Sequence, residues 1–359
     1  MKINTNKVLI LHDYFQVNGG AERLITVLHQ KLSGSTLMIG YLSKNYIGDE
    51  FIKKNIFTLC NISFIPLLIQ VILKFLIKIK KTDKFDIIIY SGIYSVLNVL
   101  HQKTGKKIYY CHTPPRFIFD KEDIYLDAFN VLLKPIMKVI FSVYRYFYVK
   151  SINQMDKVIT NSNHMKNVIK KLLNVEANVV FPPIKQPSNK DESIGNYYLS
   201  FGRLEKYKRV DLIVKAFNEM PDKKLIVASG GSELSYLKKI ANSNISFTNW
   251  LPDSQLENLI RKSISCLYIP QEEDFGMTAA EANSFGKPVI IANNGGLPEI
   301  IIDNKTGIHL PKDLTLENIK SAVIKLNKEK SAKMIDDCIK NAERFSEIKF
   351  INSIKNHII

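Results

Sequence analysis

The sequence is poor in cysteine, and its four cysteines lie too far apart to form a local metal or redox motif. Cys60, Cys111, Cys266 and Cys338 include no C-x-x-C pair, which excludes the short-spaced zinc and dithiol motifs. The start, "MKINTNKVLILHDYF", has only a short apolar run and does not resemble a secretory signal. We therefore expect reduced thiols and a cytoplasmic chain.

Two motifs of nucleotide and metal chemistry are also missing. The dinucleotide fingerprint G-x-G-x-x-G does not follow the first strand of either half, which disfavours a dehydrogenase. The chain has no Asp-x-Asp motif and no compact cluster of His, Asp and Glu at ligand spacing. We expect no bound metal and no cofactor.

Acidic side chains are scarce, and the shortage lies in the first half. The chain has 50 Lys and Arg against 34 Asp and Glu, a formal net charge of +16. Residues 1–180 carry +13 of this charge and residues 181–359 carry +3. Such asymmetry points the first half toward nucleic acid or an acidic membrane surface. No compact motif of basic and aromatic residues for nucleic acid is evident, so we favour the membrane.

Long hydrophobic runs occur, but lysines interrupt them. In "FIPLLIQVILKFLIKIKK" (residues 64–81), Lys74, Lys78 and Lys81 form a polar stripe on a helix. The remaining run is too short for a membrane span, which needs about 20 apolar residues. Two interpretations stay open: an amphipathic helix on anionic lipid, or a helix packed on a sheet with its lysines in water. Residues 132–150 repeat the mix of basic and aromatic side chains, which favours lipid.

Short β-branched runs alternate with amphipathic helical patterns along the whole chain. A length of 359 residues, 46% of them hydrophobic, suits two domains with a core each. Apolar strands without polar alternation predict parallel sheets covered on both faces. The predicted fold class is therefore α/β, with two doubly wound domains and a cleft between them. The predicted strands span residues 7–11, 85–90, 106–111, 157–160, 178–181, 197–201, 224–229, 245–248, 265–270 and 287–292.

The predicted boundaries follow from one break in the pattern. Residues 181–196 contain three prolines, a polar cluster and a glycine, and we interpret them as the interdomain linker. Residues 1–180 then form the N-terminal domain. Residues 197–345 form the C-terminal domain. Residues 346–359 form a helix that packs back toward the N-terminal domain.

Three consecutive acids follow the predicted strand at residues 265–270. Ligands of parallel sheets meet the carboxyl ends of strands, so Glu272, Glu273 and Asp274 are expected to face the cleft. Carboxylates repel phosphate, and their targets are therefore neutral hydroxyl groups such as those of a sugar. For Glu273 a solvated loop acid with no ligand stays an alternative.

The helix predicted after these acids favours an anion at its start. Free backbone amides near Gly276 and Met277 suit a phosphate, so a sugar joined to a phosphate satisfies both the loop and the helix. Thr278 and Glu281 match a capping box, in which Glu281 needs no ligand.

Two cations follow the predicted strand at residues 197–201. Arg203 and Lys208 suit a diphosphate, because fixed positive charge neutralises a leaving group that becomes more negative. A pair of ordinary surface cations stays an alternative.

Taken jointly, several segments resemble the retaining nucleotide-sugar glycosyltransferases of family 4, especially bacterial mannosyltransferase-like members. These enzymes have the GT-B architecture of two facing Rossmann-like domains, which implies that residues 1–180 are the acceptor-side domain and residues 197–345 the nucleotide-sugar-binding domain. The segments are "GRL" followed by "YKRVD", "EEDFGMTAAEANSFGKPVI", "GGLPEII", "HDYFQVNGGAERL" (residues 12–24) and "YYCHTPPRFIFD" (residues 109–120).

The resemblance implies a role for each matching residue. Glu281 matches the residue that binds the nucleotide ribose, and Glu273 the one that binds donor-sugar hydroxyls. The complete set implied for donor binding is Gly19, Gly20, Arg203, Lys208, Glu273, Asp274, Phe275, Gly276, Met277 and Glu281. Gly19 and Gly20 match a loop that lets the first domain close on the donor.

The same resemblance implies a catalytic group and acceptor contacts in the first half. His112 matches the histidine near the transferred sugar, and Arg116 and Asp120 are expected to contact sugar or acceptor. The implied catalytic set is His112, Glu273, Arg203 and Lys208. We expect the leaving diphosphate to help deprotonate the incoming hydroxyl, with retention of configuration and no metal.

The implied reaction is transfer of a hexose, with GDP-mannose as the first candidate donor, to a lipid-linked saccharide. The chain would lie on the inner face of the membrane and act in the synthesis of cell-surface polysaccharide or lipopolysaccharide. Two alternatives stay open: a nucleotide-sugar epimerase or hydrolase on the same fold, and a basic nucleic-acid-binding protein.

Overall fold

The computed structural model describes residues 7–16, 19–43, 55–60, 67–77, 79, 82–187 and 194–358. The chain divides into two compact units. Unit 1 is Met1–Pro182 with Phe350–Ile359, and unit 2 is Pro183–Lys349. Part of the predicted linker, residues 188–193, lies outside the described residues.

Unit 1 is built on a seven-stranded sheet in the order β3-β2-β1-β4-β5-β6-β7, and every neighbouring pair is parallel. The strands are β1 (Val8–Phe15), β2 (Thr36–Leu42), β3 (Ile56–Thr58), β4 (Ile87–Ser91), β5 (Lys106–Cys111), β6 (Lys157–Thr160) and β7 (Asn178–Val179). The helices are α1 (Gly20–Lys31), α2 (Leu67–Leu76), α3 (Glu122–Leu126), α4 (Lys134–Ile152), α5 (Asn163–Leu173) and α14 (Glu347–Ile358), with 3-10 helices at Thr82–Lys84, Ser95–His101 and Arg116–Ile118.

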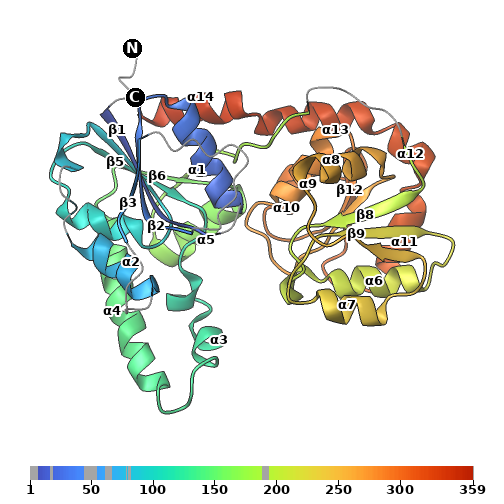
Figure 1. Ribbon diagram of the computed structural model, residues 1–359, viewed down its shortest axis with the longest axis horizontal. Coiled ribbons are helices and arrows are strands. Elements are labelled where there is room, and N and C mark those ends of the chain that lie inside the picture. The colour runs from blue at the N-terminus through green and yellow to red at the C-terminus, as the bar shows by residue number, and fades with distance from the viewer. Residues whose placement is uncertain are drawn as a thin grey trace. The chain divides into compact units, whose positions relative to one another are not determined.

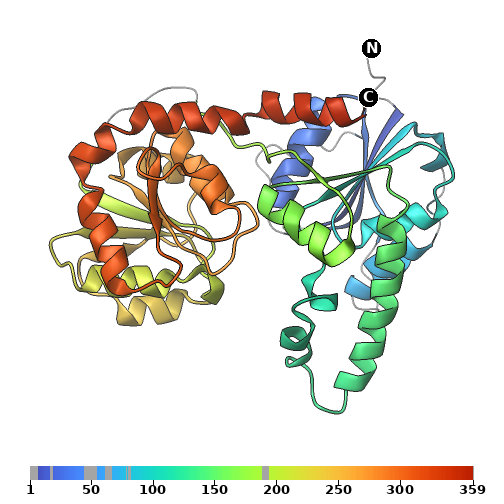
Figure 2. The same ribbon diagram turned by 180° about the vertical axis from the view of Figure 1, so that it is seen from behind.

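Helices cover both faces of this sheet because alternate residues of β1 point to opposite sides. Val8 and Ile10 share one core with α1 and α14, whereas Leu9 and Leu11 share the other with α2 and α4. Figures 1 and 2 show α1 and α14 on one side of the sheet and α2 and α4 on the other.

The helix predicted within residues 64–81 is α2, and it packs on the sheet. Val71 and Phe75 are buried in the core with β1, while Lys74 is exposed. Lys78 and Lys81 lie outside the described residues. In the part of the chain that the structure describes, no helix is long and apolar enough to cross a membrane.

Unit 2 is built on a six-stranded parallel sheet in the order β10-β9-β8-β11-β12-β13. The strands are β8 (Tyr197–Phe201), β9 (Lys224–Ala228), β10 (Ile245–Phe247), β11 (Cys266–Tyr268), β12 (Val289–Ala292) and β13 (Gly307–Leu310). The helices are α6 (Val210–Asn218), α7 (Leu234–Ile240), α8 (Asp253–Lys262), α9 (Met277–Ser284), α10 (Leu297–Ile300), α11 (Leu316–Lys325), α12 (Lys328–Ala332) and α13 (Ile335–Ala342), with 3-10 helices at Lys206–Lys208 and Glu343–Phe345. Figure 1 shows α6 and α7 on one face of the sheet and α8 and α9 on the other.

The two parallel sheets confirm the predicted fold class of two Rossmann-like, doubly wound domains. The sequence missed three strands, β2, β3 and β13, and ended β1 too early. β1 continues to Phe15, so His12 and Asp13 belong to the carboxyl end of a central strand. This end of the sheet is where the polar residues of unit 1 gather.

Candidate active site

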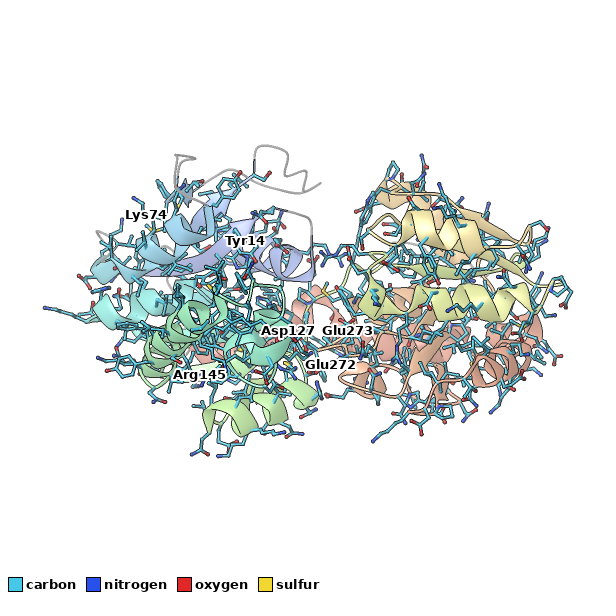
Figure 3. All side chains as sticks on the ribbon, turned by 90° about the horizontal axis from the view of Figure 1, so that it is seen from below. Tyr14, Lys74, Asp127, Arg145, Glu272 and Glu273 are labelled. Carbon is cyan, nitrogen blue, oxygen red and sulfur yellow. The ribbon has the colours of Figure 1, made fainter. Side chains whose placement is uncertain are left out.

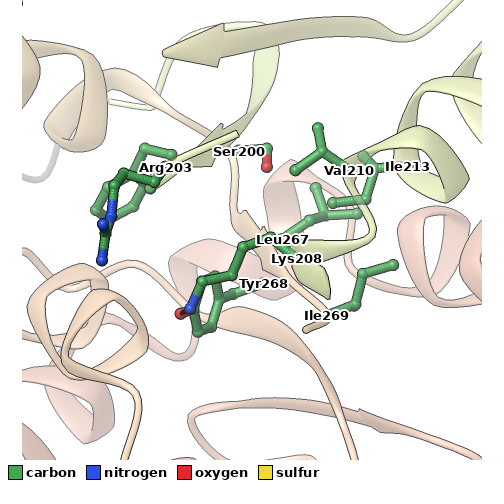
Figure 4. Close-up of a pocket in the computed structure, with 10 residues that line it drawn as sticks. Ser200, Arg203, Lys208, Val210, Ile213, Leu267, Tyr268 and Ile269 are labelled. Carbon is green, nitrogen blue, oxygen red and sulfur yellow. Dashed lines mark hydrogen bonds between the residues drawn. The ribbon is translucent and has the colours of Figure 1, made fainter. Parts of the chain in front are cut away.

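In unit 2, the site begins at the carboxyl ends of β8 and β11. These strands are neighbours in the sheet, so the residues that follow them meet at one edge. Arg203, Lys208 and Tyr268 line a common pocket there, with the apolar side chains of Val210 and Ile213 behind it (Figure 4). The two predicted cations therefore share one pocket, as the spacing of the sequence suggested.

Lys208 and Glu273, which the sequence assigned to phosphate and sugar respectively, are in direct contact. The Nζ atom of Lys208 donates to Oε2 of Glu273 at 2.6 Å and to the hydroxyl of Tyr268 at 2.6 Å. The Tyr268 hydroxyl donates to the same Oε2 at 2.5 Å. Burial, and then the charge of Glu273, raise the pKa of Tyr268. Tyr268 therefore keeps its proton, and the three groups form one closed polar cluster.

Arg203 differs from Lys208 in its exposure. Its side chain is exposed to solvent, whereas the side chains of Lys208 and Glu273 are 14% and 18% exposed. The site thus combines a partly buried ion pair with an exposed cation, and both cations line the pocket that Figure 4 shows.

The acidic loop is fixed by close backbone contact with the segment before α10. The amide of Gly296 donates to the carbonyl oxygen of Glu273 at 2.8 Å. A Cβ atom at Gly295, where φ is +58°, would lie 2.1 Å from that oxygen. Glycine is therefore required at Gly295, because only a residue without a side chain admits the loop. Figure 3 shows Glu272 and Glu273 together on the loop.

The helix after the loop starts differently from the prediction. Gly276, with φ of +110°, is the N-cap of α9, and no side chain caps the helix. The predicted capping box is wrong because the helix begins at Met277, which puts Thr278 one residue inside it. The amides at the start of α9 follow Gly276, where the sequence predicted an anion. Glu281 lies at the fifth position of α9 and is partly buried, and Phe275, two residues before the helix, is buried.

The sequence missed two residues of this half. Tyr268 holds the ion pair, and Arg209 fixes the chain just before the acids. Arg209 Nε donates to the carbonyl of Ile269 at 3.1 Å, and Nη2 donates to that of Pro270 at 2.6 Å. The segment "YKRVD" contains Arg209, but its partners lie about 60 residues away in the chain, and local spacing carries no signal of them.

In unit 1, the polar end of the sheet is built from three neighbouring strands. His12 of β1 is buried, and its Nδ1 lies 3.1 Å from Oγ of Ser91 at the end of β4. The same oxygen lies 2.8 Å from Nε2 of His112, which follows β5. Burial lowers the pKa of His112 to about 4, and burial together with the charge of His112 lowers that of His12 to about 3. Both rings are neutral at neutral pH.

The predicted glycine loop lies at the start of α1. Gly19 is the extended N-cap and Gly20 the first residue of the helix, while Val17 and Asn18 lie outside the described residues. Its amides are at the same carboxyl end of β1 as His12, since β1 ends at Phe15.

Arg116 and Asp120, the predicted acceptor contacts, bind each other. Nε of Arg116 donates to Oδ1 of Asp120 at 2.6 Å, and Nη2 makes a second, shorter bond to Oδ2. This bidentate pair holds the pKa of Asp120 below its usual value. A ligand that binds either side chain has to replace the Arg116–Asp120 hydrogen bonds or use the atoms that these bonds leave open.

Among the residues that the structure describes, no group of three or more His, Cys, Asp or Glu side chains is arranged to hold a metal ion.

Two families match consecutive parts of the chain. The family described as "Glycosyltransferase Family 4" matches residues 19–184, and "Glycosyl transferases group 1" matches residues 182–345. Together the matches cover unit 2 almost completely and most of unit 1.

Individual relatives are more distant. The alpha-1,3/1,6-mannosyltransferase ALG2 of Saccharomyces cerevisiae is 27% identical over 306 residues, and the match covers 70% of this chain and 57% of ALG2. The chain thus spans little more than half the length of that relative.

Solved structures share the fold over nearly the whole chain. The Anabaena protein Alr3699/HepE in complex with UDP superposes with a TM-score of 0.72 at 16% identity, covering 98% of this chain and 99% of that one. WaaG, a glycosyltransferase involved in lipopolysaccharide biosynthesis, superposes with a TM-score of 0.67 at 14% identity, covering 98% and 99%. With both halves matched by glycosyltransferase families and both sheets shared with GT-B proteins, the chain belongs to glycosyltransferase family 4, near its mannosyltransferases.

Proposed function

We propose that this protein transfers a hexose from a nucleotide diphosphate sugar to a saccharide acceptor, with retention of configuration and without a metal ion. The observation that carries the proposal is the cluster of Lys208, Glu273 and Tyr268 beside Arg203 at the carboxyl ends of β8 and β11. It sets two positive charges at one pocket and a carboxylate in direct contact with the pocket residues Lys208 and Tyr268, and a sugar diphosphate needs both kinds of group.

In this proposal, donor binding changes the partners of Lys208 and Glu273. Before the donor arrives, Lys208 is neutralised by Glu273, so neither charge is left uncompensated in a partly buried site. A diphosphate then attracts Lys208 and the exposed Arg203, and Glu273 accepts hydrogen bonds from sugar hydroxyls. The ribose is held by Glu281, and the α9 amides at Gly276 and Met277 complete the anion site.

The mechanism that we propose for retention of configuration depends on whether Glu273 attacks the sugar or binds it. A nucleophilic carboxylate would need an oxygen free to attack the sugar, as in retaining hydrolases. In this proposal Glu273 is used to hold the donor instead: Oε2 keeps its bond from Tyr268 after Lys208 turns to the diphosphate, and sugar hydroxyls donate to the carboxylate. We therefore assign Glu273 to binding, and the leaving diphosphate, held by Arg203 and Lys208, to deprotonation of the acceptor hydroxyl on the same face.

Mannose is the sugar that we propose, with GDP-mannose as the donor. Its support is the yeast relative, whose name describes an alpha-1,3/1,6-mannosyltransferase. For the acceptor we propose a lipid-linked saccharide of cell-surface polysaccharide or lipopolysaccharide synthesis. In this proposal His112 acts beside the transferred sugar, and Arg116 and Asp120 contact the sugar or acceptor.

The test is a thermal-shift screen against a panel of nucleotide sugars with matched charge variants. We expect GDP-mannose to stabilise the parent, and Lys208→Met, Arg203→Met and Glu273→Gln to lose most of that stabilisation. Lys206→Met is the control, because Lys206 is an exposed cation only two residues from Lys208. A donor that stabilises parent and site variants equally would remove the site assignment.

Product analysis separates transfer from the other reactions possible on this fold. With donor, a saccharide acceptor and a chelator, we expect a glycoside with the anomeric configuration of the donor. Free sugar formed without acceptor would indicate a hydrolase, and an epimeric nucleotide sugar an epimerase. Activity lost on chelation and restored by a divalent cation would contradict metal independence.

We also propose that unit 1 binds an anionic membrane surface through the α3–α4 hairpin, which projects from the sheet (Figures 1 and 2). Ten large apolar side chains there are 49–80% exposed: Ile124, Tyr125, Val131, Leu132, Leu133, Ile136, Val139, Ile140, Val143 and Tyr146. Along α4 the exposed ones recur at three and four residues, opposite the buried Phe141 and Tyr144, and form one face. Such a contiguous exposed patch marks an interaction site.

Charge on the same helix favours lipid as the occupant. Lys138 and Lys150 are exposed on α4 beside the apolar face, in the half of the chain that carries +13. An amphipathic helix with apolar and cationic faces lies at the boundary of headgroups and acyl chains. Two of the acidic residues nearby are paired, Asp127 with Lys134 and Glu122 with Arg145.

Co-sedimentation with vesicles tests this surface. Leu132→Ser with Val139→Ser should weaken binding to anionic vesicles about tenfold, because two apolar anchors are lost. Ile324→Ser with Ile348→Ser removes similarly exposed side chains, 61% and 75% exposed, and should leave binding unchanged. Failure of the parent to sediment with anionic vesicles at low salt would contradict the proposal. Binding to random oligonucleotides instead would favour a nucleic-acid-binding protein.

A further inference from the structure

Lys208 in the pocket of unit 2 has aromatic neighbours as well as polar partners. Its Nζ atom lies over the ring of Tyr207, 5.0 Å from the centroid, and 5.1 Å from the centroid of the Tyr268 ring. Both distances are within the range of about 6 Å over which the face of an aromatic ring attracts a cation. Tyr268 also binds this ammonium group through its hydroxyl, which Figure 4 shows beside Nζ, whereas Tyr207 contributes its ring.

We propose that Tyr207 is a positioning residue that holds the ammonium group of Lys208 at the pocket through its ring face, whether or not Glu273 is paired with Lys208. The inference rests on the function proposed above, because it concerns how the pocket keeps its cation when the donor diphosphate arrives. In that function Glu273 turns to sugar hydroxyls, and Lys208 loses the partner that neutralises it. A partly buried charge without compensation is costly, and an aromatic ring supplies attraction that does not depend on Glu273.

The contact is not an automatic result of Tyr207 and Lys208 being neighbours in sequence. Both belong to the 3-10 helix Lys206–Lys208, in which successive side chains point about 120° apart. The Lys208 side chain therefore has to fold back to bring Nζ over the Tyr207 ring, and there it also reaches the hydroxyl of Tyr268 at 2.6 Å. The ring and the hydroxyl together define one place for the ammonium group.

The backbone and the burial of the two residues favour a strong contact. The carbonyl oxygen of Tyr207 accepts from the amide of Gln271 at 2.7 Å, which fixes the start of the tyrosine side chain beside the segment after β11. The side chain of Lys208 is 14% exposed, whereas Tyr207 is 44% exposed. A cation that is largely removed from water gains more from an aromatic face than an exposed cation does.

A ring face also suits a lysine that has to bind phosphate. An ammonium group has three N–H donors, and Glu273 accepts from one of them as a charged group that competes with an anionic ligand. An aromatic face attracts the whole cation and carries no net charge, so it neither repels the diphosphate nor has to be displaced by it. Tyr207 therefore keeps its contact while Lys208 changes partner.

Calorimetric titration of the full-length protein with GDP-mannose tests the role of the ring. We expect Tyr207→Leu to weaken binding about fivefold, because leucine keeps apolar bulk but has no π face. Tyr207→Phe restores the ring and should recover the affinity to within about twofold. Tyr236→Leu is the matched control, because Tyr236 of unit 2 is also 44% exposed, and it should leave the affinity unchanged. Equal losses in the leucine and phenylalanine variants of Tyr207 would overturn the proposal.

A double-mutant cycle with Lys208→Met shows whether the ring acts through the lysine. In the Lys208→Met background, Tyr207→Leu should change the donor affinity less than about twofold, because the cation that the ring attracts is gone. A loss of about fivefold in both backgrounds would mean that the ring contacts the ligand itself or supports the fold. That outcome would overturn the proposal.

Urea unfolding without ligand, followed by fluorescence of the single tryptophan, Trp250, separates this inference from the proposed function. Tyr207→Leu should change the unfolding equilibrium constant about fivefold in the parent and in Glu273→Gln, and less than about twofold in Lys208→Met. Effects that are equal in all three backgrounds, or that vanish in Glu273→Gln, would overturn the proposal. Coupling of Tyr207 with Lys208 in a protein that no nucleotide sugar stabilises would contradict the proposed function alone, and donor binding without this coupling would contradict the inference alone.

Discussion

The ion pair of Lys208 and Glu273 is held by a third group, the hydroxyl of Tyr268. Burying two opposite charges costs desolvation energy that their attraction offsets only when the geometry is good and the remaining atoms are hydrogen-bonded. Tyr268 supplies that bond to Glu273 from a buried position at the end of β11. The charges are therefore oriented before a ligand arrives, which is the condition for electrostatic stabilisation of a transition state.

Gly295→Ala should destabilise unit 2 and displace the acidic loop. The added Cβ would lie 2.1 Å from the Glu273 carbonyl oxygen in a left-handed backbone conformation. We expect a loss of about 2–4 kcal/mol in the free energy of unfolding, against about 1 kcal/mol for the left-handed conformation alone. Urea unfolding followed by fluorescence of Trp250, which lies in unit 2, gives the measurement.

Asn249→Ala is the control for Gly295→Ala. Asn249 has the same φ of +58° and an exposed side chain, so it reports the cost of the backbone conformation without the clash. Equal losses in the two variants would show that the contact with Glu273 is not what requires glycine.

His12→Gln should flatten the acid dependence of stability in unit 1. Burial lowers the pKa of His12 to about 3, against about 6.5 in the unfolded chain. The unfolded state therefore binds the extra proton below pH 6.5, and the stability due to neutral His12 is lost as the pH falls from about 6.5 toward 3. Between pH 7 and 5 we expect the variant to lose about 2 kcal/mol less than the parent.

Other groups titrate in the same pH range, but their contributions to stability cancel when the parent and the His12→Gln variant are compared. His112, with a pKa lowered to about 4, acts in the same direction as His12. Asp13 acts in the opposite direction, because burial raises its pKa to about 6 and its contribution falls as the pH rises through that value. Unfolding is followed by circular dichroism, since Trp250 reports unit 2. Parallel pH profiles would contradict the assignment of a neutral His12.

For individual site residues, the sequence predicted which residue types matter better than it predicted which residues they contact. Lys208 and Glu273 stood out because cations and acids followed strand ends, and the structure brings them into contact; their roles stay predictions. Tyr268 and Ser91 were missed because one partner of each, Lys208 and His12, is 60 and 79 positions away. Those distances are closed by the register of parallel strands, which no local pattern specifies.

Between elements, the 3-10 helix at Lys206–Lys208 and the start of α6 are tied to the segment after β11. Arg209 donates to two consecutive carbonyls of that segment, and the amide of Gln271 donates to the carbonyl of Tyr207 at 2.7 Å. The pocket cations and the acidic loop are thus parts of one assembly. A substitution at Arg209 should therefore displace Glu273, although Arg209 itself is not assigned a ligand contact.

Arg209→Lys tests whether the two hydrogen bonds from Arg209 position the acidic loop. Lysine keeps the charge but lacks the planar fork that reaches two carbonyls. We expect calorimetric donor affinity to fall about tenfold in both Arg209→Lys and Arg209→Met, which corresponds to about 1.4 kcal/mol. Wild-type affinity in Arg209→Lys would show that charge, rather than the two fixed bonds, is what the site needs from Arg209.

Elements were predicted best where they were apolar and regular. The strand prediction failed for β2, β3 and β13. The last two have only three and four residues and take part of their stability from pairing with β2 and β12, whereas β2 has seven residues and its length does not explain why it was missed. The capping box failed because Gly276 adopts a left-handed conformation and starts α9 without a side-chain cap. A sequence pattern does not reveal that Leu297 packs against this glycine and leaves no room for a side chain.

For the whole molecule, unit 1 is discontinuous in sequence and unit 2 is continuous. Unit 1 takes its last ten residues, Phe350–Ile359, from the far end of the chain. Phe350, Ile351, Ile354 and Ile358 of α14 are 2–6% exposed in the core around β1. The sequence predicted a terminal helix here, but the identity of the strands it covers depends on contacts between residues more than 300 positions apart.

Truncation after Lys349 should therefore unfold unit 1 and spare unit 2. Burial of each large apolar side chain contributes about 1.5–3 kcal/mol, and losing four of them is comparable with the entire folding free energy of a domain, about 5–15 kcal/mol. We expect circular dichroism to show loss of unit 1 structure at 25 °C, while the unfolding transition of Trp250 fluorescence in unit 2 stays in place. Ile354→Ala is the milder companion, expected to cost about 2–5 kcal/mol, whereas Ile348→Ala, at an exposed position of the same helix, should cost little. A truncated chain that keeps both unfolding transitions would contradict this prediction. It would mean that unit 1 folds without α14, and that α14 only packs on a core that is already stable.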